Sequence, residues 1–259
     1  RHLSSAASDV YKRQVKIHIY NEMKKQNIPE EILSLITEEE INLFQELQIK
    51  IKELNNKTNL TRLTDGDDYW VSQVFDSIWP FKAFTNINFD NKKFLDIGSG
   101  CGFPGLAYAI THPNSEIYLI DSLKKKTDAI KILVEQINFK NNIHVINDRV
   151  ENLAHQSSMR NNFNIATTRA VSNPSTVSEY ILPMLKKEGF GVLYCGKWTN
   201  QESKNLDKTL EILEGKVKDK KEILLPRNKG TRNIILIQPK NFCPEIYPRK
   251  VGKPEKNPL

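Results

Sequence analysis

The sequence predicts an α/β protein whose seven-stranded, mainly parallel sheet follows an N-terminal helical extension. Three observations support this fold class. From Lys92 onward, short β-rich runs alternate with helical segments, which is typical of a doubly wound parallel sheet. Before that point the sequence shows only helical periodicity and turns. A cluster of four glycines follows the first β-rich run, at the place where such sheets bind ligands.

The N-terminal third contains helical patterns but no strand pattern. Residues 1–14 lack an initiator Met and the apolar core of a signal peptide, so we interpret them as an adapter-derived scar outside the fold. Thr37 and Glu40 have the spacing of a capping box, in which two side chains bind backbone N–H groups at a helix start. The helical patterns are residues 15–36, 37–55 and 67–80, within a predicted extension of residues 15–90.

The rest of the sequence predicts a sheet domain at residues 91–240 and a basic tail at residues 241–259. The predicted strands are residues 93–97, 116–121, 142–147, 163–168, 189–196, 222–226 and 233–238. Helical patterns fill most of the gaps, which favours parallel strands. Only a short segment separates the last two runs, so we expect them to be antiparallel neighbours.

The first strand is followed by a glycine loop in the stretch KFLDIGSGCGFPG, with glycines at Gly98, Gly100, Gly102 and Gly105. Glycine reaches positive φ without a Cβ clash and lets a ligand approach the main chain, while the following helix start offers unpaired N–H groups. The loop therefore predicts a site for a nucleotide-like cofactor. The last three glycines also match the dinucleotide spacing G-x-G-x-x-G, so the glycines leave the identity of the cofactor open.

Polar residues follow the other strands at the same edge of the sheet, where ligands of such folds lie. Asp121 ends the second strand, where a carboxylate can accept both ribose hydroxyl protons; an ordinary helix N-cap is the alternative. The third strand leads into residues 148–151, which form either a cofactor wall or a plain surface turn. The fourth strand leads into Thr168 and Arg169.

Composition argues against several classes of protein. The 259 residues are 39% hydrophobic and 27% charged, with a mean hydropathy of −0.51 and no apolar run near the ~18 residues of a membrane span. We therefore expect a cytoplasmic protein. Three separated cysteines, Cys101, Cys195 and Cys243, indicate neither a disulfide framework nor a zinc site, and no histidine spacing suggests a metal.

The net charge of +7 is concentrated in two regions. Residues 216–232 carry seven Lys or Arg against two acidic residues, and residues 239–259 carry five against two. The rest of the chain is slightly acidic. A polyanion bound on the C-terminal side would explain this distribution, and so would a solvated basic face.

The ordered motifs LDIGSGCGFPG, YLIDS, NDRVENL, TTRAV, GTRN and YPRKVGKP resemble the bacterial 16S ribosomal RNA guanine-N7 methyltransferase family, also called glucose-inhibited division protein B. The resemblance covers residues 40–259. It implies S-adenosylmethionine as cofactor, a Rossmann-like methyltransferase fold, and methylation of a guanine in the 530 loop of 16S rRNA, in free form or in the small ribosomal subunit. One departure is Ser72 and Gln73, where similar proteins often have a basic residue and His.

The resemblance also implies roles for individual residues. By position, the methionine part of the cofactor would lie beside Gly98 and Phe103, the ribose beside Asp121, Ser122 and Leu123, the adenine beside Val150 and Glu151, and the mouth of the site beside Arg169.

Guanine N7 carries a lone pair and no proton, so the sequence need not supply a general base or a covalent nucleophile, and alignment should provide most of the acceleration. We assign no catalytic residue. The Asn-Pro-Pro-aromatic motif of exocyclic-amine methyltransferases and the Pro-Cys or Thr-Cys nucleophile of C5 enzymes are both missing. For Arg169 we expect a contact with the methionine carboxylate or a phosphate; the alternative is a salt bridge to a carboxylate such as Glu151.

Basic and aromatic residues form a candidate RNA surface on a protein expected to be a monomer. The basic candidates are Lys124, Lys125, Lys126, Lys197, Arg227, Lys229, Arg232, Arg249, Lys250 and Lys253, and the stacking candidates are Tyr194, Trp198 and Tyr247. Burial in the core is the alternative for each aromatic residue. Three other functions stay open: a nicotinamide-dependent oxidoreductase, a small-molecule methyltransferase, and a non-catalytic RNA-binding protein that retains the cofactor loop.

Overall fold

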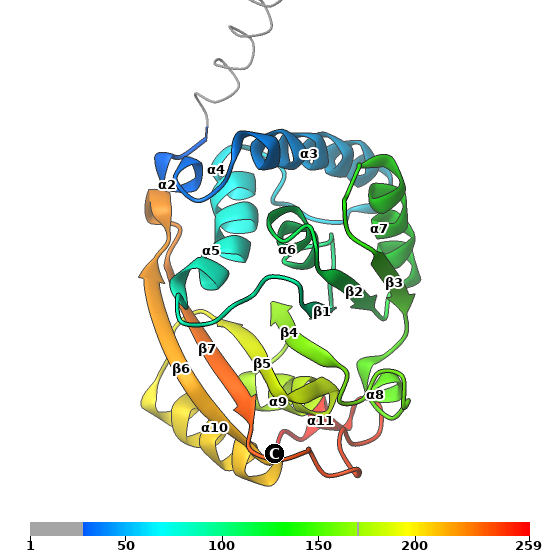
Figure 1. The fold of residues 1–259 in the computed structure, drawn as a ribbon, viewed down its shortest axis with the longest axis vertical. Coiled ribbons are helices and arrows are strands. Elements are labelled where there is room, and N and C mark those ends of the chain that lie inside the picture. The colour runs from blue at the N-terminus through cyan, green and yellow to red at the C-terminus, as the bar shows by residue number, and fades with distance from the viewer. Residues whose placement is uncertain (1–27, 170) are drawn as a thin grey trace, which may run out of the picture.

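The computed structural model describes residues 28–169 and 171–259, and a single seven-stranded sheet runs through its centre (Figure 1). The strands are β1 (Lys93–Ile97), β2 (Glu116–Asp121), β3 (Ile143–Asn147), β4 (Phe163–Arg169), β5 (Leu185–Cys195), β6 (Gly215–Leu224) and β7 (Thr231–Pro239). Their order is β3-β2-β1-β4-β5-β7-β6. The first five are parallel, and β7 is antiparallel to both β5 and β6. The predicted fold class is confirmed.

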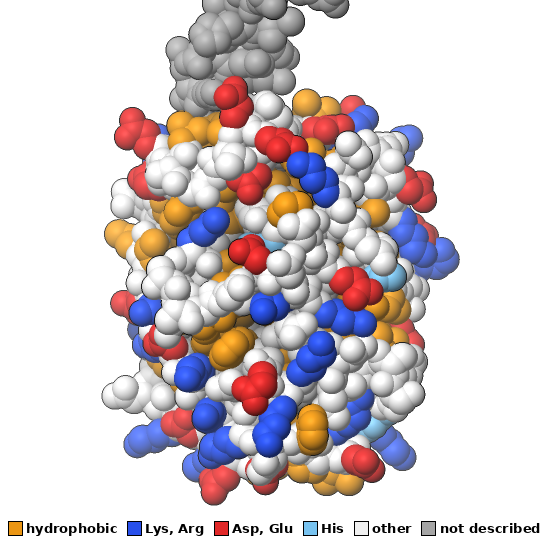
Figure 2. Space-filling model, in the orientation of Figure 1, with side chains coloured by type: hydrophobic (Ala, Val, Ile, Leu, Met, Phe, Trp, Pro, Cys, Tyr) orange, Lys and Arg blue, Asp and Glu red, His pale blue; other side chains and the backbone are white. Residues whose placement is uncertain are grey.

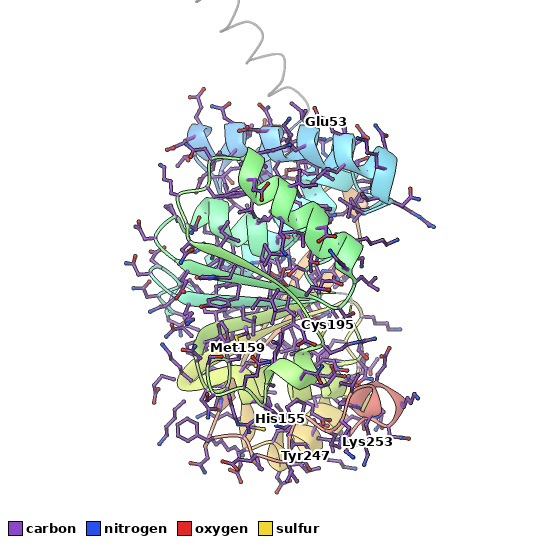
Figure 3. All side chains as sticks on the ribbon, turned by 90° about the vertical axis from the view of Figure 1, so that its right-hand side faces the viewer. Glu53, His155, Met159, Cys195, Tyr247 and Lys253 are labelled. Atoms are coloured by element: carbon purple, nitrogen blue, oxygen red, sulfur yellow. The ribbon has the colours of Figure 1, made fainter. Side chains whose placement is uncertain are left out.

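Helices cover both faces of the sheet (Figures 1 and 3). The α-helices are α2 (Glu30–Leu33), α3 (Glu38–Thr58), α4 (Gly66–Tyr69), α5 (Asp76–Ala83), α6 (Gly105–Thr111), α7 (Lys124–Gln136), α8 (Val150–Leu153), α9 (Pro174–Ile181), α10 (Asn200–Ile212) and α11 (Lys253–Lys256). One apolar cluster joins α3, α5, α6 and α7 to the sheet, and a second joins α8, α9 and α10 to the opposite face. No helix in the described residues is long and apolar enough to cross a membrane.

Burial on both faces explains why the central strands are apolar without a polar side. Phe94 of β1 is buried in the first cluster, where its ring stacks on Tyr108 at 3.8 Å. The next residue, Leu95, is buried in the second cluster. Successive side chains of a strand point to opposite faces, so a strand between two helical layers needs apolar residues at both its odd and its even positions.

The chain order places a crevice at the end of β1. From β1 the chain passes outward to β2 and β3, and then returns to the other side of β1 as β4. The loops after β1 and β4 therefore leave the sheet in different directions. This reversal opens a crevice beyond the carboxyl ends of the two strands, which is where ligands bind in sheets of this kind.

The helical extension packs on the first cluster and differs from the prediction at one point. The capping box of α3 is present, with Thr37 N–H donating to Glu40 Oε2 at 2.6 Å and Glu40 N–H to Thr37 Oγ1 at 3.3 Å. The predicted helix ending at Pro80 is wrong in its C-terminal boundary. A π-helix at Trp70–Phe75 joins α4 to α5, and α5 continues past the proline to Ala83. Residues 1–27, including the predicted scar and part of the first helix, lie outside the described residues.

The last two strands are antiparallel neighbours as predicted, but β6 begins at Gly215 rather than at residue 222. The first half of β6 is lysine-rich, and its periodic signal is weak because one side faces solvent. Lys216, Lys218 and Lys220 are exposed there. Since β6 is an edge of the sheet, charged side chains along it oppose pairing with another chain.

Candidate functional site

The glycine loop after β1 adopts the backbone that its composition predicts. Gly98, Gly100 and Gly102 have φ angles of +74°, +61° and +100°. A Cβ on Gly98 would lie 2.6 Å from Val171 Cγ2, so the glycine also permits the loop after β4 to approach. At Gly105, the first residue of α6, a Cβ would lie 2.2 Å from Leu119 Cδ2. A side chain would clash at either position, so the loop and its helix pack closely against the neighbouring strands.

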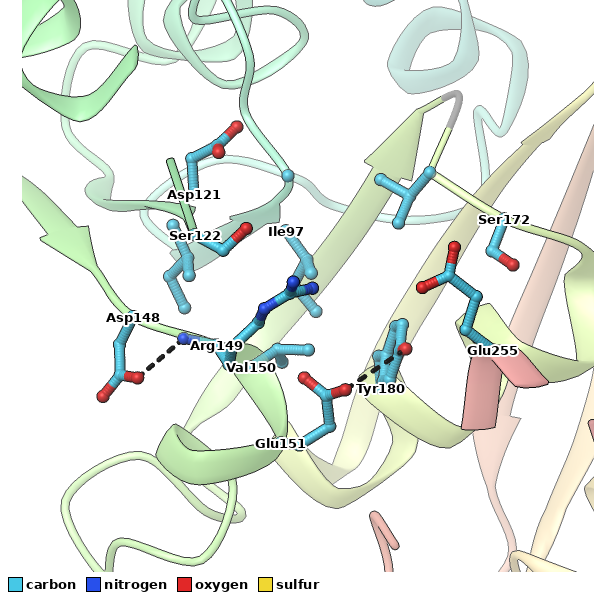
Figure 4. A pocket seen from close by; sticks show the side chains of 13 residues that line it. Ile97, Asp121, Ser122, Asp148, Arg149, Val150, Glu151, Ser172, Tyr180 and Glu255 are labelled. Carbon is cyan, nitrogen blue, oxygen red and sulfur yellow. Dashed lines mark hydrogen bonds between the residues drawn. The ribbon is translucent and has the colours of Figure 1, made fainter. Parts of the chain in front are cut away.

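A pocket of about 480 Å³, which we call the cofactor pocket, lies beyond the ends of β1, β2 and β3 (Figure 4). Its lining includes five of the eight residues predicted for the cofactor, namely Gly98, Asp121, Ser122, Val150 and Glu151. Leu123 is not in the lining. Its side chain is 47% exposed, and its backbone N–H donates to Asp121 Oδ1 at 2.9 Å. Leu123 therefore contacts the Asp121 carboxylate through its backbone and does not border the pocket.

A second cavity, which we call the mouth cavity, meets the cofactor pocket at Gly98. Its empty volume is about 1080 Å³, and it contains the two other predicted residues, Phe103 and Arg169. The structure thus divides the predicted set between two adjoining cavities. The first cavity contains the residues predicted for the ribose and adenine, the second those predicted for the methionine part and the mouth, and Gly98 lies in both.

Carboxylates dominate the cofactor pocket. Asp121, Asp148, Glu151 and Glu255 line it, against one cationic residue, Arg149. Asp121 is buried, and its Oδ2 accepts a hydrogen bond from Gly100 N–H at 3.0 Å, so the ribose candidate is tied to the glycine loop. Each carboxylate oxygen can accept more than one hydrogen bond, which leaves capacity for a ligand hydroxyl. An uncharged or cationic ligand is favoured here over an anion.

Glu151 is also buried, and its Oε1 accepts a hydrogen bond from Gly252 N–H at 3.0 Å and one from Tyr180 Oη–H at 3.4 Å (Figure 4). Burial is the main cause that raises the pKa of Tyr180, with the nearby Glu151 and Glu255 carboxylates adding to it. Tyr180 therefore stays protonated and able to donate. The plain surface turn considered for residues 148–151 is not what forms, because Val150–Leu153 is a short helix with both Val150 and Glu151 buried.

Arg169 points into a polar cluster and not toward Glu151. Its Nη1 donates to Ser72 O at 2.9 Å and lies 3.4 Å from Asp76 Oδ2, while its Nη2 donates to Gln73 Oε1. Arg232 also binds the Asp76 carboxylate, through Nε at 2.7 Å and Nη2 at 2.9 Å. The alternative considered for Arg169, a salt bridge to a carboxylate, is therefore present, but its partner is Asp76, directly after the π-helix, and not Glu151.

The departure at residues 72 and 73 acquires a structural role in this cluster. Gln73 is 2% exposed; besides accepting from Arg169, its Nε2 donates to Thr61 Oγ1 at 3.2 Å and to Cys101 Sγ at 3.3 Å. Cys101 belongs to the glycine loop. The glutamine thus connects the helical extension, the loop and the end of β4, all of which border the mouth cavity.

Asp96 lies beneath the loop and is fully buried. Its Oδ2 accepts from Gly105 N–H at 3.0 Å and its Oδ1 from Thr167 Oγ1 at 3.3 Å. Burial raises the pKa of Asp96 to about 6, and the Gly105 hydrogen bond and the positive charge of Arg169 oppose that rise. Asp96 lines neither cavity, and its two hydrogen bonds connect β1 to the start of α6 and to β4.

Several residues of the candidate RNA surface are engaged inside the protein. Arg249 binds Glu179, which is 0% exposed, with Nη2 at 2.7 Å from Oε2 and Nε at 2.9 Å from Oε1. Tyr194 is buried and donates to Ser77 O at 3.0 Å. Burial, the alternative considered for each aromatic residue, is what the structure shows for Tyr194, and the RNA contact of Arg249 stays a prediction. Trp198 and Tyr247 are half-buried against the second apolar cluster.

The C-terminal segment is packed against the sheet domain. Thr176 Oγ1 donates to Pro254 O at 2.9 Å, and Arg160 Nη1 donates to Tyr247 O at 2.8 Å. This packing brings Glu255 to the cofactor pocket. On the face shown in Figure 2, Lys and Arg side chains are most frequent over the lower half, where the C-terminal elements lie.

Two of the three described cysteines are held as thiols by burial. Burial raises the pKa of Cys195 to about 12 and that of Cys243 to about 12, so both remain thiols at neutral pH. Across residues 28–169 and 171–259, no group of three or more His, Cys, Asp or Glu is arranged to hold a metal ion.

Sequence reasoning did not find Tyr180, Ser172 and Glu255, which complete the cofactor pocket. Ser172 lies three residues beyond β4, so the rule that ligands lie after strands could have found it. Tyr180 lies inside α9 and Glu255 in α11. Neither position carries a local signal, because both reach the pocket only through tertiary packing.

The chain is similar to proteins of one family along most of its length. The family model for rRNA small subunit methyltransferase G (GidB) matches residues 40–233. A protein from Prochlorococcus marinus strain MIT 9215, named ribosomal RNA small subunit methyltransferase G, is 98% identical over 237 residues, which cover 92% of this chain and 100% of that protein. A protein of the same name from strain NATL1A is 43% identical, with 86% of this chain and 90% of that protein covered.

Among solved structures, the mitomycin 7-O-methyltransferase MmcR shares the fold, with a TM-score of 0.51 at 10% identity over 76% of this chain and 67% of that chain. The residues matched by the family model include the whole glycine loop, and the two relatives cover 92% and 86% of this chain. This protein belongs to the rRNA small subunit methyltransferase G (GidB) family.

Proposed function

We propose that this protein transfers the methyl group of S-adenosylmethionine to N7 of a guanine in the 530 loop of 16S rRNA. The observation that carries the proposal is the cofactor pocket at the topological switch point of a chain that belongs to a small-subunit rRNA methyltransferase family. The bound cofactor would supply an electrophilic methyl group on a sulfonium. The chain itself would bind, orient and exclude water.

The charge of the cofactor pocket favours S-adenosylmethionine over a dinucleotide. Four carboxylates and one arginine line the pocket, so the pyrophosphate of NAD would meet repulsion there. An adenosyl ligand without phosphates meets none, and its ribose hydroxyls can donate to Asp121. This charge balance argues against the oxidoreductase that the glycine spacing alone left open.

We propose that the cofactor is held by residues of both cavities. Asp121 and Ser122 would bind the ribose, with Leu123 fixing Asp121 through its backbone N–H; Val150 and Glu151 would border the adenine, and Gly98 and Phe103 the methionine part. At the mouth cavity, Arg169 and Arg232 carry two positive charges against the single carboxylate of Asp76. The remaining positive charge suits the methionine carboxylate, the first of the two ligands expected for Arg169.

Reaction at N7 requires no activated side chain. That nitrogen needs no proton removed before it attacks, so the chain must supply alignment in place of base catalysis. Burial raises the pKa of Cys195, the last residue of β5, so its side chain remains a thiol. A C5 mechanism would need it as a thiolate.

Calorimetry with S-adenosylmethionine and with NAD tests the cofactor, and we expect binding of the first alone. Transfer of tritium from labelled S-adenosylmethionine to deproteinised 16S rRNA and to intact small subunits then tests the substrate, with the modified base identified after digestion. Methyl transfer to neither RNA substrate, despite cofactor binding, would favour a small-molecule methyltransferase or a non-catalytic RNA-binding protein. A cytoplasmic location and a monomeric state remain predictions.

A further inference from the structure

A third cavity, which we call the base pocket, lies between the carboxyl ends of β4 and β5 and the starts of α9 and α10. Its empty volume is about 610 Å³. It shares Val171 and Ser172 with the cofactor pocket, and Tyr194 and Gly196 with the mouth cavity. A molecule in the base pocket would therefore lie next to the cofactor on one side. On its other side it would contact residues that line the base pocket and neither of the other two cavities.

The floor of the base pocket contains a buried hydroxyl without a partner. Thr168 is 2% exposed, and its Oγ1 has no hydrogen bond within the described residues. Val177 and Leu193 beside it are buried and apolar. Buried hydroxyls are nearly always hydrogen-bonded in folded proteins, so an unpaired one that borders a cavity indicates that the cavity receives a polar ligand. Val177 and Leu193 offer apolar surface to the face of a flat heterocycle, while Ser172, Asn173, Lys197 and Glu202 supply the polar part of the lining.

The side of the pocket away from the cofactor carries a fixed carboxylate. Glu202 is the third residue of α10 and forms a capping box with Thr199, whose N–H and Oγ1–H donate to Oε2 at 2.7 Å and 2.8 Å. The helix start therefore sets the position of the carboxylate before any ligand binds. Glu202 lines the base pocket and neither of the other two cavities.

We propose that the base pocket receives the target guanine, with Glu202 accepting hydrogen bonds from the N1–H and 2-amino groups and the Thr168 hydroxyl bonding to the base. This inference rests on the proposed function. N7 and the N1–H edge lie on different sides of a guanine, so an N7 that faces the cofactor leaves the N1–H edge free to face Glu202. Adenine has an acceptor at N1 and no 2-amino group, so the same carboxylate would disfavour it.

The charge of Glu202 also bears on the rate of the reaction. As the N7 lone pair forms its bond to the methyl carbon, the bond from that carbon to sulfur breaks and its electron pair stays on sulfur. The positive charge of the sulfonium passes to the purine, and no proton needs to leave. A carboxylate fixed beside the N1–H edge interacts more strongly with the charged purine than with neutral guanine, and it therefore lowers the barrier more than it strengthens binding.

A Glu202→Gln variant tests this inference because glutamine retains the capping box while the charge is lost. We expect single-turnover methyl transfer to small-subunit RNA to fall by about 100-fold, the lower end of the range for loss of one electrostatic contact in a transition state. The melting temperature and the affinity for S-adenosylmethionine should not change. The matched control is Glu211→Gln, an exposed position on the same helix, which should retain the wild-type rate.

A modified substrate separates recognition of the base from a structural effect. RNA with inosine at the target position lacks the 2-amino group, and we expect the wild type to methylate it several-fold more slowly than guanine while the Glu202→Gln variant shows a smaller difference. A Glu202→Gln variant with wild-type rate and wild-type guanine preference would overturn the inference and leave the proposed function intact. A wild-type protein that binds S-adenosylmethionine but methylates no small-subunit RNA would overturn both.

Discussion

The Asp76 carboxylate ties the helical extension to the sheet, and its removal should strongly destabilise the protein. Asp76 begins α5 and is 1% exposed, while its partners Arg169 and Arg232 come from β4 and β7. Substitution of Asp76 by Asn would leave two partly buried guanidinium groups without their counter-charge. Breaking a buried ion pair from one side costs about 3–5 kcal/mol, mainly because the remaining charge is left uncompensated.

For a domain of this size, 1 kcal/mol changes the melting temperature by about 2–4 °C, so the Asp76→Asn variant should melt at least about 6 °C lower. Urea unfolding followed by circular dichroism gives the free energy directly. The matched control is Asp128→Asn, which breaks the exposed i,i+4 pair with Lys124. That pair should contribute only about 0.3–0.5 kcal/mol.

A double-mutant cycle shows whether the loss comes from the ion pair. In the Asp76→Asn background, Arg232→Gln should cost much less than it does in the wild type, because the charge that Arg232 balanced is already gone. If Asp76→Asn loses less than about 1 kcal/mol, or if the two substitutions are additive, then the cluster does not join the extension to the sheet as described.

Three further substitutions test other parts of the site. Burial raises the folded-state pKa of Asp96 from 3.8 to about 6, so protonated Asp96 stabilises the protein at low pH, and this stability is lost as the pH rises through about 6. The loss between pH 4 and 7 is about 2 kcal/mol at 1.36 kcal/mol per pKa unit, and urea unfolding at the two pH values should show that Asp96→Asn removes it. Gly105→Ala should destabilise by about 1–3 kcal/mol through overpacking, whereas Gly196→Ala, with nothing within 4 Å of the added Cβ, should change the free energy of unfolding by less than about 0.5 kcal/mol. Arg249→Ala should lower the melting temperature by leaving Glu179 buried and unpaired, and the salt dependence of rRNA binding should not change; a smaller slope with an unchanged melting temperature would return Arg249 to the RNA surface.

The parts of the site that follow from sequence are those made by local chain geometry. The strand, glycine loop and helix from β1 to α6 are contiguous, and the residue types there are required by positive φ and close packing. Asp121 follows from the rule that parallel strands end at one edge of the sheet. These features could be predicted because each depends on residues within a short stretch of chain and on a known sheet architecture.

The partners of those residues could not be predicted in the same way. Arg169 and Asp76 are 93 positions apart, and their contact depends on how the π-helix at Trp70–Phe75 packs against the sheet. Glu255 reaches the cofactor pocket because Arg249 and Glu151 hold the C-terminal segment in place. Sequence periodicity reports which face of an element is buried, but it does not report which element lies opposite.

The same limit applies to the net charge. A basic total predicts a polyanion partner only if the cations are free to meet it. Five of the cations named from sequence already have carboxylate partners: Lys124 with Asp128, Lys126 with Asp121, Lys229 with Asp68, Arg232 with Asp76, and Arg249 with Glu179. Each paired cation would release fewer counterions on binding RNA than an exposed one. The salt dependence of rRNA binding should therefore reflect exposed residues such as Lys125 and Lys197, and it should be shallower than a count of all Lys and Arg in the basic segments predicts.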